Sequence, residues 1–330
     1  MNKNKIIGIL KENGLYDDER GILDTNEIDD FLKNYKMNKS HINTLPENIV
    51  RSDDGFLMIE SVPYIISRKK EEGHNLKYWL LFDNGCRALL KNLNWIKIQN
   101  ELLFKYLCNW LDIPCVDVDA CYLGSTKFLV SPSFLGINEK ALNYYNGTTS
   151  TSLNIKKLLE EDSASLTEYE PIESRFYRDF TKHLDIEQLI KMADRIKQSF
   201  FIRRVLLVDI LAQNQDRFPR NIKIINGKEG IRSCPLFDHE ILGINGESLC
   251  FKMLPSINDS ANYDDIINYL LKDNEFRNWC LEKILLRQVP DFREMIYRDK
   301  KIYVDDEVVE SFNKTINDGK SIILDNYKYK

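Results

Sequence analysis

No run of about 18 apolar residues, the length that a helix needs to cross a bilayer, occurs in the sequence. The N-terminus begins with lysines, but the apolar stretch behind them, residues 6–10, is short and contains Gly8, and no small-residue cleavage site follows. We therefore expect neither a membrane-spanning segment nor a secretion signal, and we predict a protein of the cytoplasm. Export as an effector by a route that needs no signal is an alternative.

Cysteine and histidine patterns that bind metal are also missing. The seven cysteines include no Cys-x-x-Cys pair, and the four histidines are scattered, so no zinc-site spacing is present. Several cysteines stand within apolar patterns, which predicts buried, reduced thiols and a reducing compartment. A Gly-x-Ser-x-Gly nucleophile elbow is absent as well, so serine-hydrolase chemistry is not indicated.

The charge balance is mildly acidic. There are 46 Lys and Arg against 51 Asp and Glu, a net charge of -5, and no long block of Lys or Arg appears. Nucleic acid is therefore not expected as a direct partner, because neutralising phosphates needs a basic face. A chain of 330 residues is long enough for two lobes around a sizeable core.

The spacing of apolar residues divides the chain into three predicted parts. Residues 1–54 are a small helical extension. Residues 55–134 are strands around one helix, with a hairpin whose Asn84-Gly85 turn supplies the positive φ that such turns need. The other elements predicted in this part are a helix over 99–111 and strands over 116–123 and 127–130.

Residues 135–330 are the third part, in which helical spacing prevails. The pattern predicts a long helix over 186–213 whose end is apolar nearly all round, which indicates burial. A second hairpin is predicted at Asn226-Gly227. Further helices are predicted over 264–272, 275–286 and 305–317.

Three polar residues follow the buried end of the long helix. Asp216 and Asn221 stand five positions apart in a polar loop, and Asp238 ends an apolar strand after the second hairpin. Phosphoryl transfer needs such a set: one carboxylate near the attacking hydroxyl, and two oxygen donors that hold Mg²⁺ against the phosphates of ATP. Asp-x-x-x-x-Asn alone is common in turns, but its place after a buried helix favours phosphotransfer.

The same segment resembles the catalytic segment of HipA-like serine/threonine kinases, and it is especially similar to the stand-alone bacterial kinases of the CtkA type. Those proteins have Asn-x-Asp-Arg-x-x-x-Asn, a hairpin, and an apolar strand that ends in Asp; this chain matches them at residues 214–221 and 235–238. Upstream, residues 87–91 are similar to the strand with the ATP lysine. Residues 100–101 resemble the start of the following helix, and residues 128–134 the strand and hinge beside adenine.

The resemblance covers residues 55–290 and implies an α+β, bilobal protein-kinase-like fold. Residues 55–134 are then a small antiparallel-sheet N-lobe, and residues 135–330 are a mostly helical C-lobe. Residues 1–54 lie outside the resemblance. ATP and Mg²⁺ are the implied cofactors, with ATP in the cleft between the lobes.

Carried over position by position, the resemblance assigns roles to side chains. Lys91 contacts the α- and β-phosphates, and Glu101 pairs with Lys91. Asp216 orients or deprotonates the acceptor hydroxyl, while Asn221 and Asp238 bind Mg²⁺. The hinge residues that offer backbone to adenine are Ser131, Ser133 and Phe134.

The loop expected to cover the phosphates, residues 71–77, is poor in glycine. It has no Gly-x-Gly-x-x-Gly motif, and its candidates for nucleotide contact are Gly73 and His74. Phe218 also departs from the family, which often has His there, and Asp238 is followed by His239 where a small turn is commoner. Reduced or altered activity is therefore an open alternative.

The implied activity is phosphorylation of serine and threonine hydroxyls of proteins, with autophosphorylation included. Three alternatives stay open. In the first, the chain is a small-molecule or lipid head-group kinase, since related folds phosphorylate those. In the second, it is a nucleotide-binding pseudokinase that acts as an interaction module through residues 1–54. The third, which the HipA resemblance implies, is a toxin component bound by an antitoxin partner.

Overall fold

The structure is a computed structural model. It describes residues 7, 8, 10, 11, 16, 17, 21, 22, 43–66, 76–82, 84–135, 140–143, 186–214, 221–227, 230–240, 242 and 263–328.

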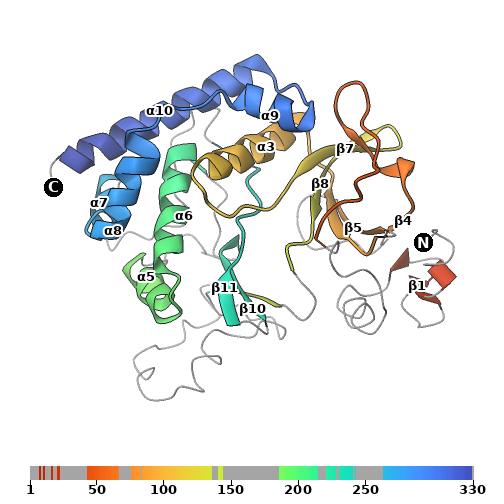
Figure 1. Ribbon diagram of the computed structural model, residues 1–330, viewed down its shortest axis with the longest axis horizontal. Helices are drawn as coiled ribbons and strands as arrows, with labels where there is room; N and C mark the ends of the chain where they lie inside the picture. Colours follow the sequence, from red (N-terminus) through yellow and green to blue (C-terminus); the bar gives the residue numbers. More distant parts are fainter. Residues whose placement is uncertain are drawn as a thin grey trace. The chain divides into compact units, whose positions relative to one another are not determined.

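The chain folds into two compact units. The sheet unit consists of Met1–Lys105, Val116–Glu139 and Phe292–Val304, and the helical unit consists of Tyr106–Cys115, Lys140–Asp291 and Asp305–Lys330. Strands prevail in the first and helices in the second (Figure 1). The predicted α+β class, with a small sheet-bearing part and a mostly helical part, is confirmed. The predicted boundaries near residues 54 and 134 stay predictions.

The sheet unit is built on a six-stranded sheet with the order β3-β7-β8-β6-β5-β4. Neighbouring strands are antiparallel, as predicted, apart from β3 and β7, which are parallel. The strands are β3 (Leu57–Met58), β4 (Tyr64–Ile66), β5 (Lys77–Phe82), β6 (Arg87–Lys91), β7 (Asp119–Leu123) and β8 (Thr126–Pro132). A short ribbon of β1 (Tyr16–Asp17) and β2 (Gly21–Ile22) belongs to the same unit, and a 3-10 turn, Ile59–Ser61, follows β3.

The predicted hairpin at Asn84-Gly85 is confirmed. It joins β5 to β6, which pair antiparallel, and Gly85 has a φ of 88°, a conformation that only glycine adopts without strain. The side chain of Asn84 accepts a 2.9 Å hydrogen bond from the Cys86 N–H and donates one of 3.1 Å to the Thr44 carbonyl. This turn is thereby tied to the segment that precedes the sheet.

The two faces of β6 have different surroundings, since side chains alternate along a strand. Ala88 and Leu90 contribute to a hydrophobic core with side chains of β5, β7, β8 and of the segment 49–62. Arg87, Leu89 and Lys91 share the opposite face. Arg87 and Lys91 are buried there, while Leu89 between them is half-exposed. This face therefore holds two buried cations with a partly open apolar position between them.

Helix α3 (Trp95–Trp110) begins four residues before its predicted start at residue 99. Asn94 explains the difference, because its side chain accepts a 2.9 Å hydrogen bond from the Lys97 N–H and so caps the helix. The first part of α3 belongs to the sheet unit and its last turns to the helical unit.

Residues 292–304 join the sheet unit although they stand far along the chain. Their helix, α9 (Phe292–Lys300), was not predicted, because its mean hydropathy is low and its buried positions are spaced four residues apart. Lys300 is buried and lies 3.3 Å from Asp119 of β7. Arg51 reaches the same carboxylate with two hydrogen bonds of 3.1 and 2.7 Å. These charges tie α9 to the sheet.

The helical unit contains the long helix α10 (Asp306–Lys328), which packs against α6 and α7 (Figure 1). The other helices that the structure describes in this unit are α5 (Ile186–Arg195), α6 (Ser199–Ala212), α7 (Tyr263–Leu270), α8 (Asn274–Cys280) and the π-helix Leu281–Leu285. α10 continues past its predicted end at residue 317. A side chain at Gly319 would lie 3.0 Å from the Cα atom of Leu211, so this glycine permits α10 to approach the end of α6 closely.

Three helices, α3, α5 and α6, end in the same way. The residues after them, Asp112, Lys197 and Gln213, have φ values of 55°, 56° and 48°. In each case the next backbone N–H bonds the carbonyl five residues earlier, at 2.9, 2.7 and 2.9 Å respectively. This is a Schellman ending, in which glycine is usual. The ending at Lys197 splits the single helix predicted over 186–213 into α5 and α6.

The second hairpin is confirmed, but its turn differs from the prediction. β10 (Lys223–Gly227) pairs with β11 (Gly230–Ser233) on one side and with β9 (Lys140–Asn143) on the other. Gly227 lies opposite Gly230, so residues 228–229, which lie outside the described residues, connect the strands. The predicted turn at Asn226-Gly227 is wrong because both residues belong to β10.

The predicted burial of the cysteines is confirmed for those that the structure describes. Five are buried as free thiols, and Cys115 is half-buried; Cys250 lies outside the described residues. Burial raises the pKa of Cys86 to about 12, so this thiol is protonated at neutral pH and unreactive.

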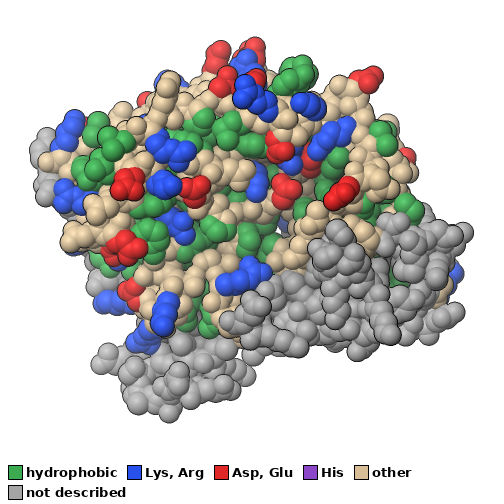
Figure 2. All heavy atoms as spheres, in the orientation of Figure 1, with side chains coloured by type: hydrophobic (Ala, Val, Ile, Leu, Met, Phe, Trp, Pro, Cys, Tyr) green, Lys and Arg blue, Asp and Glu red, His purple; other side chains and the backbone are tan. Residues whose placement is uncertain are grey.

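The surface carries both signs of charge. Basic and acidic side chains are interspersed with hydrophobic ones on the face drawn in Figure 2, in keeping with the small net charge. Among the described residues, no helix combines the length and the hydrophobicity that a membrane span requires.

Candidate active site

Lys91 and Glu101 form a buried ion pair in the sheet unit. Lys91 is the last residue of β6, and Glu101 lies in the second turn of α3. The distance from Nζ of Lys91 to Oε1 of Glu101 is 3.0 Å, and the two residues are 6% and 2% exposed. The pair that the resemblance implied is therefore present. Its role with a nucleotide stays a prediction.

The end of β8 and the segment after it carry the predicted hinge residues. The backbone N–H of Ser133 donates a 2.7 Å hydrogen bond to the Arg87 carbonyl, and the Ser133 hydroxyl accepts one of 3.3 Å from Nη2 of Arg87. Ser131 donates from its hydroxyl to the Asp117 carbonyl at 2.9 Å. Phe134 follows and is half-buried. The hinge segment is thus held against the start of β6 by both backbone and side chains.

In the helical unit, the end of α6 is fixed by a buried polar pair. Nδ2 of Asn214 donates a 2.8 Å hydrogen bond to Oδ1 of Asp209, and both residues are buried. The predicted catalytic Asp216 lies in the stretch 215–220, outside the described residues. Asn221 follows that stretch directly, is 3% exposed, and precedes β10. Buried side chains therefore stand at both ends of the segment that contains Asp216.

Asp238 follows an isolated β-bridge and not the strand that was predicted to end at it, because β11 ends at Ser233. Leu236 forms a parallel bridge with Cys115, and its N–H donates a 2.9 Å hydrogen bond to the Pro114 carbonyl. Asp238 itself has a φ of 67°. A left-handed backbone is unfavourable for most side chains and tends to occur at functional positions, with Asp and Asn tolerating it best. This observation singles Asp238 out within its loop.

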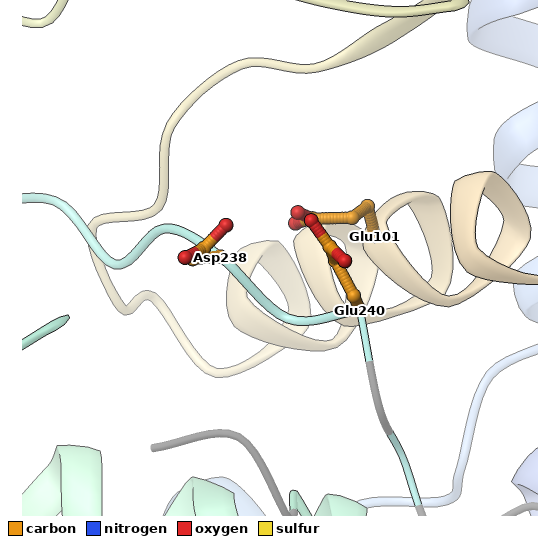
Figure 3. A group of neighbouring side chains, drawn as sticks. All are labelled: Glu101, Asp238 and Glu240. Atoms are coloured by element: carbon orange, nitrogen blue, oxygen red, sulfur yellow. The ribbon is translucent and has the colours of Figure 1, made fainter. Parts of the chain in front are cut away.

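Glu240 is a residue that the sequence analysis did not assign. A carboxylate oxygen of Glu240 lies within 4.8 Å of one of Asp238, and Glu240 is buried. Figure 3 shows these two side chains on the segment after β11, together with Glu101 on α3. The sequence carries no signal for this pair, because the left-handed backbone of Asp238 breaks the extended conformation in which positions two apart share a face.

The neighbouring carboxylates of Asp238 and Glu240 suit a hard divalent cation. Asn221, Asp238 and Glu240 offer amide and carboxylate oxygens, which Mg²⁺ and Mn²⁺ prefer over nitrogen or sulfur. The other two predicted nucleotide contacts, Gly73 and His74, lie outside the described residues. The described part of the predicted site is thus the Lys91–Glu101 pair with the predicted hinge residues in one unit, and Asn221 and Asp238 in the other.

No protein-family model matches the chain, and no curated protein matches it. Solved structures do match. The proinflammatory kinase CtkA of Helicobacter pylori is 12% identical, with 79% of this chain and 93% of that chain covered and a TM-score of 0.48. HipA of Shewanella oneidensis MR-1, in complex with HipB and operator DNA, is 13% identical, with 94% of this chain and 71% of that chain covered and a TM-score of 0.41.

A third similar structure is the Golgi casein kinase with Mn/ADP bound. It is 13% identical, with 94% of this chain and 78% of that chain covered and a TM-score of 0.36. CtkA and HipA, the two types named from the sequence motifs, are thus both among the solved structures that match. Likeness at this level assigns no activity, so the function has to be inferred from the residues.

Proposed function

We propose that this protein is a kinase that transfers the terminal phosphoryl group of ATP, with Mg²⁺, to serine or threonine hydroxyls of proteins. The buried Lys91–Glu101 pair is the observation that supports this most. A buried ion pair gains little stability over well-packed apolar side chains, so stability alone does not account for it. Leu89, on the same face of β6, is half-exposed, so this face is open to a ligand, and the ammonium group of Lys91 suits an anionic one.

In the sheet unit, the proposed roles follow from the positions along β6. Lys91 donates to the α- and β-phosphates, and Glu101 holds the ammonium group in place. Leu89, two residues before Lys91 on the same face, packs against the base. The backbone of the hinge segment supplies hydrogen bonds to the edge of the base.

In the helical unit, the proposed roles belong to oxygen-bearing side chains. Asp216 orients the acceptor hydroxyl or accepts its proton, and a positioned base of this kind contributes about 10² to 10⁴ in rate. Asn221 and Asp238 hold Mg²⁺, with Glu240 as an additional carboxylate. Mg²⁺, when bound, neutralises charge that develops on the phosphates. The buried Asn214 and Asn221 fix both ends of the segment that carries Asp216.

The acceptor is proposed to be protein because of the sequence resemblance, and the antitoxin partner implied by HipA stays a prediction. The test incubates the full chain with Mg²⁺ and γ-labelled ATP. Casein, phosphoinositide vesicles and an aminoglycoside are offered in parallel, and phosphosites are mapped by mass spectrometry. We expect label on serine or threonine of casein or of the chain itself. Transfer only to the lipid or the aminoglycoside would favour the small-molecule alternative.

Asp216→Asn is the matching variant, since it removes the charge and keeps the shape. We expect transfer to fall at least about 100-fold, with ATP binding retained. Asp325→Asn, at an exposed carboxylate of α10, is the control and should transfer like the wild type. Wild-type transfer by Asp216→Asn would remove Asp216 from the mechanism. ATP binding with no transfer to any acceptor would identify a pseudokinase instead.

A further inference from the structure

Arg87 is a buried cation at the hinge end of β6. It is 9% exposed, and its guanidinium lies 5.9 Å from the ring centroid of Trp79. Nη2 of Arg87 donates a 3.3 Å hydrogen bond to the Ser133 hydroxyl, and the Arg87 carbonyl accepts one of 2.7 Å from the Ser133 N–H. Backbone and side chain both hold Arg87 against the segment proposed to contact the base.

The distance between Arg87 and Lys91 matches the length of a nucleotide. Both side chains lie on one face of β6, four residues apart, and a strand rises about 3.3 Å per residue, so their Cα atoms are about 13 Å apart along the strand. A nucleoside triphosphate spans a similar length from base to phosphates. If its phosphates lie at Lys91, as the proposed function requires, its base lies near Arg87.

The guanidinium group selects hydrogen-bond acceptors. Arginine has five N–H donors and no acceptor. The edge of a 6-oxo purine such as guanine presents two acceptors, O6 and N7, and arginine binds both at once. Adenine presents N7 beside an amino donor, which arginine cannot pair with. A donor-only side chain at this place therefore makes a 6-oxo purine bind better than it would in a site that lacks such a side chain.

We propose that Arg87 reads the base of the bound nucleotide, so that GTP serves as a phosphoryl donor alongside ATP. This inference rests on the proposed function, which it deepens by naming a second nucleotide and the residue that selects it.

The test compares kcat/KM for ATP, GTP and ITP in the full chain. ITP has the 6-oxo group of GTP without its 2-amino group, so it isolates the atom that Arg87 reads. We expect GTP and ITP to be used within about tenfold of ATP. In Arg87→Met, the ratio of GTP use to ATP use should fall about tenfold or more, and ITP should follow GTP.

Two further variants separate the geometry of Arg87 from its charge and provide a control. Arg87→Lys retains the charge but not the two-pronged fork, so the GTP/ATP ratio should fall in it too, even if Arg87→Met fails to fold. Arg298→Met removes an exposed arginine of α9 and should leave the ratio unchanged. Transfer from ATP but not from GTP or ITP would overturn the inference alone, as would an equal loss of all three donors in both Arg87 variants. Failure of all three nucleotides to bind the wild type would refute the proposed function as well.

Discussion

The side chain of Asn214 donates a 2.8 Å hydrogen bond to the carboxylate of Asp209, and both residues are buried at the end of α6. The backbone N–H of Asn214 also bonds the Asp209 carbonyl, at 2.9 Å. One residue pair thus fixes the point from which the segment 215–220 departs. The proposed catalytic residue Asp216 is the second residue of that segment.

Asn214→Ala should destabilise the protein by about 1–3 kcal/mol, because the buried Asp209 carboxylate loses a donor that water cannot fully replace. Urea denaturation measures the change. Asn317→Ala is the control: the Asn317 amide makes a bond of similar length, 2.9 Å, on the exposed side of α10, so its loss should cost less than about 0.5 kcal/mol. Equal losses in the two variants would contradict the role given to the buried pair.

Gly55→Ala should be severely destabilising. Gly55 has a φ of +86°, and a Cβ atom there would clash with the backbone carbonyl oxygen of Lys301. We expect a loss of about 3 kcal/mol or more in the free energy of unfolding. Gly124→Ala is the matched control, because Gly124 also has a positive φ, +60°, but a Cβ atom added there would meet nothing within 4 Å.

Gly124→Ala should therefore cost only the backbone strain, about 1 kcal/mol. The difference between the two variants measures the steric contact between the loop before β3 and the end of α9. If Gly55→Ala lost no more stability than Gly124→Ala in thermal and chemical denaturation, the close approach of Gly55 to Lys301 would be refuted.

Lys197→Gly should stabilise the protein by about 0.5–1 kcal/mol. Lys197 is exposed, has a φ of 56° and ends α5, a position that favours glycine because glycine has no Cβ. Lys197→Ala removes the same long side chain but keeps the strain, so it should change stability little. A similar gain in both variants would show that the lysine side chain, and not the backbone, was unfavourable.

Lys300 should make the stability of the protein sensitive to alkaline pH. Burial lowers the pKa of Lys300, but Asp119, Asp117 and Asp299 together raise it above the ordinary value of 10.5. Because the pKa of Lys300 is raised in the folded state, its charged form stabilises the folded protein fully below pH 10.5. That contribution is lost as the pH rises through the folded-state pKa. Unfolding free energies of the wild type should therefore fall more steeply above pH 10.5 than those of Lys300→Met. Parallel curves for the two proteins would contradict this.

Local patterns were enough to predict the parts of the fold that depend on neighbouring residues. The Asn84-Gly85 turn encodes its own backbone conformation, and the apolar end of α6 indicated burial. Asn94 was an overlooked capping signal for α3. Lys197 carries no sequence signal for a helix end, because glycine is the residue expected there; the packing of α5 and α6 holds it in that conformation.

Contacts between residues far apart in the chain could not be predicted from the sequence. The extension of α10 past Gly319 depends on the close approach of Leu211, and α9 joins the sheet through the Asp119–Lys300 contact. In the candidate site, Asn221 and Asp238 were predicted as magnesium ligands because few side chains suit that ion, and this role stays a prediction. Glu240 was not predicted, because the left-handed backbone of Asp238 has no clear sequence signal, and without it the direction of the Glu240 side chain cannot be inferred.

Calorimetric titration of ATP in the presence and absence of Mg²⁺ tests the central claim most directly. The decisive variant is Lys91→Met combined with Glu101→Leu, which replaces both buried charges with apolar side chains of similar volume and so is expected to keep the fold. We predict that the wild type binds ATP more tightly with Mg²⁺ than without it, and that the folded double variant loses at least about tenfold in affinity. A folded double variant that binds Mg²⁺·ATP as tightly as the wild type would contradict the account.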